Sequence, residues 1–254
     1  MSSIKKTIKR SILSNPQVRS ILISLFDPLF EEKLSRVESR LKDEIVQKLY
    51  ERNIVSGQGE RYDPIQTNLF YDDLCHIPRY EFAMNYVLKE DTVLDIACGV
   101  GYGTAMLGSV SQASFGVDIS QVAIQYAKVM YSRSNTKFVV GDFFDNSITA
   151  DVVVSFETLE HLNGQNFNDI LLELASFSRR LVIGSVPYQE LSGNNHFHVS
   201  FNLDERNFEV LSTLGDISFF YQTSEGEISL KKPSKKIQNL LFVFSHKPVK
   251  DSLS

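Results

Sequence analysis

The chain has 254 residues, of which 43% are apolar and 22% charged, and its formal net charge is −5. This composition excludes a fibrous repeat and a disordered chain, and it predicts one globular domain with an extension. Two cysteines cannot form a disulfide framework, which favours a reducing compartment. No apolar run reaches the roughly 20 residues that span a bilayer, and the start lacks the pattern of a signal peptide. The sequence therefore predicts a cytoplasmic protein.

Positive charge is concentrated at the start of the chain. Residues 1–26 carry five basic side chains and no acid, which leaves 21 basic and 31 acidic side chains in the remainder. An acidic body disfavours nucleic acid as a substrate. Apolar residues of the basic segment share one helical face, which predicts peripheral association with an anionic inner-membrane surface or a membrane-bound glycosyltransferase. A solvated, frayed terminus is the alternative. The apolar residues are Ile4, Ile8, Ile12 and Leu13.

A second pattern precedes the main body. Apolar residues at steps of three or four predict an amphipathic helix over residues 30–53. This helix either packs on its own domain or forms a short coiled coil in a homo-oligomer. Two nearby glycines predict a linker, so we divide the chain into a helical extension, residues 1–56, and a second domain, residues 57–250. The apolar stripe consists of Leu34, Val37, Leu41, Ile45 and Leu49.

After the linker, strand-like and helix-like segments alternate. Helical patterns cover residues 121–133 and 167–178, between short runs of β-branched and apolar residues. Such alternation predicts a parallel sheet covered on both faces, and two final strands without a helix between them predict an antiparallel closure. The fold class is therefore α/β, a Rossmann-like doubly wound, mostly parallel seven-stranded sheet with an antiparallel C-terminal strand. The predicted strands are residues 92–97, 113–118, 136–140, 151–156, 180–186, 216–222 and 238–245.

A glycine-rich loop follows the first predicted strand. The segment from Val93 to Gly103 places an apolar strand directly before glycines in the order G-x-G-x-G, where a backbone without Cβ atoms can turn sharply and lie against a ligand. The strand ends with an acid, Asp95, which would repel a pyrophosphate. A nicotinamide-binding loop reads G-x-G-x-x-G, so the pattern disfavours a nicotinamide oxidoreductase and favours a cationic ligand. A plain connection between strand and helix is the structural alternative.

Two further acids follow the next two predicted strands. Asp118 closes the second strand about 20 residues after the loop, where a carboxylate takes both hydroxyls of a ribose. Asp142 follows the third strand and is positioned for an adenine amino group, with Phe143 beside the ring. S-adenosylmethionine (SAM) fits this set, because it carries a ribose, an adenine, an ammonium and a sulfonium but no phosphate.

These motifs resemble those of class I SAM-dependent methyltransferases over about residues 61–245. In that family the region before the first strand folds over the cofactor, which implies that Tyr62 and Arg79 lie near SAM. Each of the two is otherwise an ordinary packed tyrosine or solvated arginine. The set of SAM-binding residues implied by the loop, the acids and the resemblance is Asp95, Ala97, Gly99, Gly101, Asp118, Ile119, Asp142, Phe143, Glu157, Tyr62 and Arg79.

A narrower resemblance is to bacterial methyltransferases of polysaccharide and lipopolysaccharide biosynthesis. It implies that the acceptor is a sugar or glycan intermediate. The segments that carry it are ERYDP (60–64), HIPRY (76–80), VLDIACGVGYGT (93–104), SFETLEHL (155–162) and HFHVSFN (196–202).

Histidines are the candidate catalytic bases. His161 follows the fourth strand, at the edge of the sheet where ligands bind. His196 and His198 lie in the long connection over residues 187–203, which has the length of a substrate lid. A hydroxyl acceptor must lose its proton, and a neutral histidine can take it. For each histidine, a purely structural role is the alternative.

The same region carries a metal hypothesis. Glu157, Glu160 and His161 resemble the E-x-x-E-H array of divalent-metal-dependent methyltransferases, in which a later histidine completes the set. Two carboxylates and imidazoles suit Mg²⁺, Mn²⁺ or Zn²⁺. Our leading interpretation has no metal, with Glu157 lining the cofactor site.

The sequence thus predicts SAM-dependent O-methylation of a sugar or glycan in surface polysaccharide biosynthesis. Quinone or secondary-metabolite O-methylation is the nearest alternative, because the acceptor depends only on the resemblance. A nicotinamide oxidoreductase and a degenerate methyltransferase fold that acts as a scaffold subunit are the alternatives from other classes.

Overall fold

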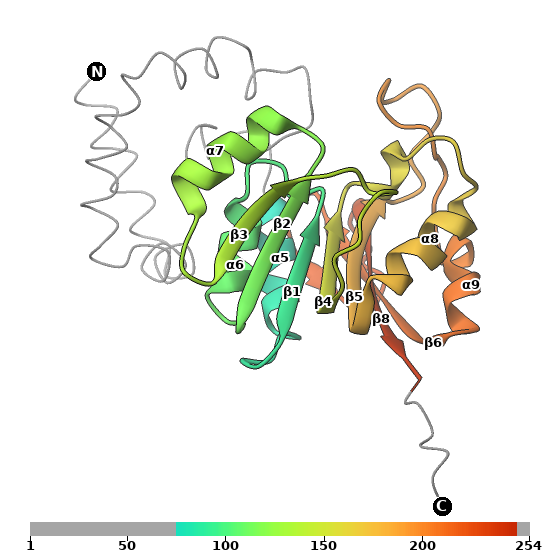
Figure 1. Cartoon of the computed structure of the whole chain (residues 1–254). Helices are drawn as coiled ribbons and strands as arrows, with labels where there is room; N and C mark the ends of the chain where they lie inside the picture. Colours follow the sequence, from blue (N-terminus) through green and yellow to red (C-terminus); the bar gives the residue numbers. More distant parts are fainter. Residues whose placement is uncertain (1–74, 248–254) are drawn as a thin grey trace, which may run out of the picture. The chain divides into compact units, whose positions relative to one another are not determined.

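The computed structural model describes residues 75–247 (Figure 1). The predicted helix over residues 30–53, the basic segment and the boundary between residues 56 and 57 lie outside the described residues. None of the helices in the described part of the chain is long and apolar enough to cross a membrane.

One sheet organises the described residues. Its strand order is β3-β2-β1-β4-β5-β8-β6-β7. The pairs among β1 to β5 are parallel, and β8 runs antiparallel to both of its neighbours, β5 and β6. The strands are β1 (Thr92–Ile96), β2 (Ala113–Asp118), β3 (Thr136–Val140), β4 (Ala150–Phe156), β5 (Ser178–Pro187), β6 (Gly215–Thr223), β7 (Ile228–Ser229) and β8 (Ile237–His246).

The predicted Rossmann-like fold is confirmed, including the antiparallel closure by β8. The structure adds β7, a two-residue strand paired with β6 that is too short for any periodicity to reveal. The helices are α5 (His76–Met84), α6 (Tyr102–Gly108), α7 (Gln121–Tyr131), α8 (Phe167–Ser176) and α9 (Glu209–Ser212), with 3₁₀ turns η1 (Leu159–His161) and η2 (Glu205–Phe208).

Side-chain caps set where two of the helices begin. The hydroxyl of Ser120 accepts a hydrogen bond from the Ala123 amide at the start of α7, and Asn166 accepts one from the Asp169 amide at the start of α8. Each cap satisfies an amide that has no partner within the helix. Helix α7 ends two residues before the predicted limit, because Ser132 is already extended.

Alternation along β1 directs its side chains into two layers. Leu94 and Ile96 belong to one buried apolar cluster with residues of α8 and α9. Asp95 points the other way and accepts hydrogen bonds from Tyr80 of α5 and Thr104 of α6. Helices therefore cover both faces of the sheet, as the doubly wound pattern requires.

Helices α5 and α6 approach so closely that one position accepts only glycine. A Cβ on Gly103 would lie 1.9 Å from Cζ of Tyr80. Withdrawal of the Tyr80 ring would disrupt its T-shaped packing against Tyr102 and Phe156. The last glycine of the loop thus serves the contact between two helices.

We expect Gly103→Ala to destabilise the fold by about 1–3 kcal/mol, the usual cost of overpacking. This loss of stability is opposite in sign to the usual effect, since alanine in place of glycine within a helix normally stabilises it by about 1 kcal/mol. Denaturant unfolding measures it. Gly141→Ala is the matched control, since a Cβ there meets only Val117 Cγ1, at 3.0 Å. Equal stability of the two variants would contradict the packing argument.

Candidate functional site

A cavity of about 620 Å³ opens at the carboxyl ends of β1 to β4. This is the edge at which open α/β sheets bind ligands, and the volume lies within the range of small-molecule sites. Predicted site residues that line it are Arg79, Ala97, Gly99, Asp118, Ile119, Asp142, Phe143, Glu157 and His161. Tyr62 lies outside the described residues.

The loop after β1 turns through left-handed backbone. Ala97, Gly99 and Gly101 have φ angles of 61°, 55° and 88°. Ala97 and Gly99 line the cavity, whereas Gly101 is not among the described lining residues. A Cβ on Gly101 would lie 2.6 Å from atoms of both Ala127 and Phe138. The expectation that every loop glycine lies against the ligand is therefore corrected: Gly99 faces the cavity, while Gly101 and Gly103 permit close packing of the protein on itself.

Asp118 joins the end of β2 to the loop after β1. Its Oδ2 accepts a hydrogen bond of 2.8 Å from the Gly99 amide, and its Oδ1 accepts one of 2.8 Å from the Ser120 amide. The side chain is buried yet lines the cavity. A carboxylate oxygen accepts more than one hydrogen bond, so both oxygens retain the capacity to bind a diol.

The next wall of the cavity combines a carboxylate with apolar surface. Asp142 Oδ1 accepts a hydrogen bond of 2.9 Å from the Phe144 amide, which fixes the turn after β3. Phe143 is buried and packs edge-on against Phe144, while Ile119 is 66% exposed. These residues offer a planar ring both apolar contact and a hydrogen-bond acceptor.

Asp95 is buried behind the loop and is not itself among the described residues that line the cavity. Its Oδ2 accepts a hydrogen bond of 2.6 Å from the Thr104 hydroxyl, and Tyr80 donates from 3.3 Å. The pKa of Asp95 is raised to about 7, mainly by burial, with a smaller increase from the nearby Asp118 and an opposing effect of the hydrogen bonds from Thr104 and Tyr80. The sequence predicted direct binding of a cation by Asp95, whereas its contacts are with α5 and α6.

Arg79 and Glu157 form an ion pair at the cavity wall. Arg79 is 2% exposed, and its Nη1 lies 2.8 Å from Glu157 Oε1. Glu157 also accepts 2.6 Å hydrogen bonds from the Ser185 hydroxyl and the Asn239 amide. Its φ of 49° is left-handed and turns the chain out of β4 toward the cavity. Sequence reasoning missed Ser185 and Asn239, since no motif marks either residue.

The three candidate histidines take different positions. His161, in η1, lines the cavity. His198 is 8% exposed and packs edge-on against His161 with ring centroids 4.6 Å apart. His196 is exposed and is not among the described lining residues. The structure therefore brings His198 to His161, and it leaves His196 at the surface of the lid, residues 188–203.

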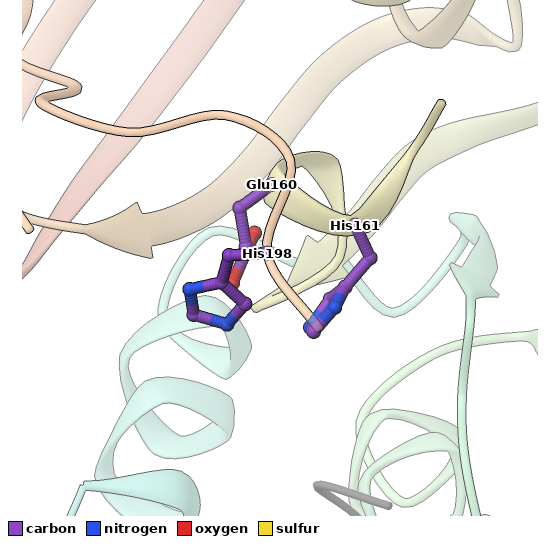
Figure 2. Close-up of side chains that lie close together, drawn as sticks. All are labelled: Glu160, His161 and His198. Atoms are coloured by element: carbon purple, nitrogen blue, oxygen red, sulfur yellow. The ribbon is translucent and has the colours of Figure 1, made fainter. Parts of the chain in front are cut away.

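The structure changes which residues form the candidate metal site. Glu160, His161 and His198 offer ligand atoms within 4.8 Å of one another (Figure 2). Figure 2 shows Glu160 and His161 reaching from η1, and His198 from the lid. Glu157 instead belongs to the Arg79 ion pair. The later histidine of the predicted array is present as His198, and Glu157 leaves the candidate set.

Comparison with known proteins gives the class of the domain. Residues 93–180 match the family described as methyltransferase domain. A probable SAM-dependent methyltransferase of Mycolicibacterium smegmatis (strain ATCC 700084 / mc(2)155) is 29% identical over 73 residues, which are 28% of this chain and 28% of that protein. The chain thus matches little more than a quarter of that relative's length.

Solved methyltransferase structures share the fold of this chain. Magnesium protoporphyrin IX methyltransferase from Synechocystis PCC 6803, with bound SAH, has a TM-score of 0.55 at 16% identity, over 84% of this chain and 99% of that chain. The N-methyltransferase NodS from Bradyrhizobium japonicum WM9, in complex with S-adenosyl-L-homocysteine, has a TM-score of 0.55 at 17% identity, over 80% and 99%. The described sheet therefore has the fold of these methyltransferases, and residues 93–180 within it match the methyltransferase domain.

Asp95 makes the fold sensitive to pH. Its pKa is about 7 in the folded protein against an ordinary 3.8, so the folded state holds a proton that the unfolded state releases between these values. Stability contributed by this proton falls as pH rises through that window. We expect the melting temperature of Asp95→Asn, relative to that of the wild type, to increase as pH rises from 5 to 8.

Calorimetry of both proteins across this range measures the difference. Asp216→Asn, which changes an exposed carboxylate, is the control and should follow the wild type. Parallel curves for Asp95→Asn and the wild type would contradict the assignment.

Proposed function

We propose that this protein is a SAM-dependent methyltransferase that O-methylates a sugar or glycan intermediate of surface polysaccharide biosynthesis. The observation that carries the methyl-transfer part is a single cavity with two walls. One wall presents Asp118 and Asp142 beside the loop after β1, and the other presents His161. The glycan part is supported by the sequence resemblance to polysaccharide methyltransferases.

The residues fit SAM by charge and shape. Asp118 would accept hydrogen bonds from the ribose hydroxyls and Asp142 one from the adenine amino group, and Phe143 and Ile119 would offer apolar contact to the ring. Together with Glu157, these side chains line the cavity with carboxylates, which suit a cationic cofactor and disfavour the pyrophosphate of a nicotinamide cofactor. SAM, when bound, supplies a methyl group on a sulfonium.

His161 then acts on the acceptor. His161 would take the proton of the acceptor hydroxyl while bound SAM would supply the methyl group, so the positive charge of the sulfonium would pass to the imidazole. Alignment of the acceptor oxygen, the methyl carbon and the sulfur would contribute much of the rate. A general base adds roughly 10²- to 10⁴-fold.

Quinone or secondary-metabolite O-methylation remains the enzyme alternative, because the same two walls serve any hydroxyl acceptor that reaches His161. A scaffold subunit without activity is the alternative from another class. Retention of the ribose acid, the adenine acid and the cavity itself favours the enzyme, since a scaffold needs none of them.

We expect Asp118→Ala to weaken SAM binding by about 100-fold or more, since a hydrogen bond to a charged group contributes about 1.5–3 kcal/mol and the ribose offers two. Isothermal titration calorimetry measures the affinity. Asp145→Ala removes an exposed carboxylate and should bind SAM normally. Unchanged affinity in a folded Asp118→Ala protein would remove the central assignment.

We expect His161→Ala to lower turnover at saturating SAM by about two orders of magnitude, the loss of a general base, with little change in SAM affinity. Release of S-adenosylhomocysteine on an acceptor that the wild type methylates gives the rate. His196→Ala changes the exposed histidine of the same lid and should keep its turnover. Normal turnover of His161→Ala would leave alignment as the source of catalysis.

A metal-assisted version of the same reaction is the second candidate, favoured by the convergence of Glu160, His161 and His198. A carboxylate and two imidazoles suit Mn²⁺ or Zn²⁺, which would polarise the acceptor hydroxyl. If EDTA silences the wild type and Mg²⁺, Mn²⁺ or Zn²⁺ restores it, the metal version replaces simple base catalysis. Full activity in EDTA excludes it.

A further inference from the structure

The lid contacts η1 near its tip. The Val199 amide donates a hydrogen bond of 2.8 Å to the Glu160 carbonyl, and the Phe197 carbonyl lies 3.1 Å from His161 Nδ1. The Phe197 amide in turn donates to Asn195 Oδ1 at 2.9 Å. The backbone of Phe197 is therefore held on both sides, next to the histidine that lines the cavity.

The side chain of Phe197 lies at the cavity and is 55% exposed. Within residues 75–247, which the structure describes, no other phenylalanine or tyrosine is exposed. Single exposed apolar residues are ordinary at a protein surface, and Leu191 of the same lid is 63% exposed. Phe197 differs from Leu191 because it lines the cavity, and within the lid it is the one residue that does so. Its ring is therefore placed to be covered by a ligand of the cavity.

A polar side chain borders the cavity close to His161. Asn163, two residues further along the chain, is exposed and lines the cavity. Its Oδ1 accepts a hydrogen bond of 2.7 Å from the Gly164 amide, so its NH₂ group is the donor that it can direct at a ligand. The exit of η1 and the lid thus bring an imidazole, an amide donor and an aromatic ring to one cavity.

The charges of the cavity favour an uncharged acceptor. Among the described lysine and arginine side chains, Arg79 alone lines the cavity, and it is paired with Glu157. Asp118 and Asp142 add further carboxylates to the lining. A phosphate or carboxylate on the acceptor would be repelled by these groups. The part of the acceptor that enters the cavity is therefore neutral.

We infer that Phe197 and Asn163 form an acceptor subsite beside His161, and that this subsite binds a neutral sugar ring. The apolar face of the sugar packs on the Phe197 ring, and a hydroxyl at its edge accepts a hydrogen bond from Asn163. A pyranose suits this pair, because its C–H bonds form an apolar face while its hydroxyls surround the edge. The use of the subsite in methyl transfer rests on the proposed function, whereas binding of the sugar does not.

Saturation-transfer difference NMR of the full chain tests the subsite with sugars of known structure. The probes are the methyl α-pyranosides of D-glucose, D-galactose and L-rhamnose, each titrated with and without S-adenosylhomocysteine. The wild type is expected to bind at least one of them. Phe197→Ala should weaken this binding by about 10-fold, since it removes the contact with an aromatic ring. Phe197→Leu, which keeps apolar volume without a ring, should also weaken binding, whereas Phe197→Tyr should retain it.

The polar half of the subsite has its own variant. Asn163→Ala should weaken glycoside binding by about 3- to 10-fold, the effect of one hydrogen bond. Leu191→Ala and Asn194→Ala change exposed lid residues that are not among the described lining residues, and both should bind as the wild type does. Melting temperatures of all variants check the fold, which the exposure of both subsite residues is expected to preserve.

Two further probes test the class of ligand. Methyl β-D-glucuronide carries a carboxylate, and it should bind more weakly than methyl β-D-glucopyranoside, its neutral counterpart. Catechol offers a flat ring with hydroxyls but no sugar. A preference for the glucuronide overturns the neutral class, and binding of catechol without binding of any glycoside overturns the sugar class. A wild type that binds none of the probes overturns the inference as a whole.

The subsite and the proposed function fail in different ways. Glycoside affinity that is unchanged in Phe197→Ala overturns the subsite, even if the protein binds SAM and transfers its methyl group. Glycoside binding that depends on Phe197 and Asn163, in a protein that neither binds SAM nor methylates any acceptor, contradicts the proposed function and leaves the subsite standing.

Discussion

The hydrogen bond from the Gly99 amide to Asp118 determines the geometry of one half of the cavity. It joins the loop after β1 to the end of β2, so the Asp118 carboxylate and the left-handed turn are positioned by each other. Behind the turn, Asp95 receives hydrogen bonds from α5 and α6, and Gly101 lets the loop lie against α7 and β3. Buried packing and hydrogen bonds thus support the wall that contains Asp118.

The opposite wall is supported differently. Glu157 leaves β4 in a left-handed conformation and is held by Arg79 from α5, Ser185 from β5 and Asn239 from β8. His161 follows four residues later and depends on the lid for its orientation. An ion pair and hydrogen bonds between distant segments therefore hold the wall of Glu157 and His161, whereas a left-handed turn and buried packing support the wall of Asp118.

This difference explains what could be predicted from the sequence. Strands and long helices came within about two residues, because their signals are local periodicity and turn chemistry. Asp118 and Asp142 were placed correctly at the cavity, since consecutive parallel strands end at one edge. The contacts of Glu157 join residues on separate elements, and the pairing of His198 with Glu190 lies in a loop without periodicity, so no spacing in the sequence reports either contact.

The attachment of the lid to η1 couples two events that an enzyme otherwise has to coordinate. The Phe197 carbonyl that orients His161 belongs to the segment that borders the cavity. Were the lid to lift, the imidazole would lose the acceptor for its Nδ1 proton at the moment water entered. Under the proposed function, an imidazole released in this way would be a poorer base while the cavity is open, which would favour transfer to an enclosed acceptor over transfer to water.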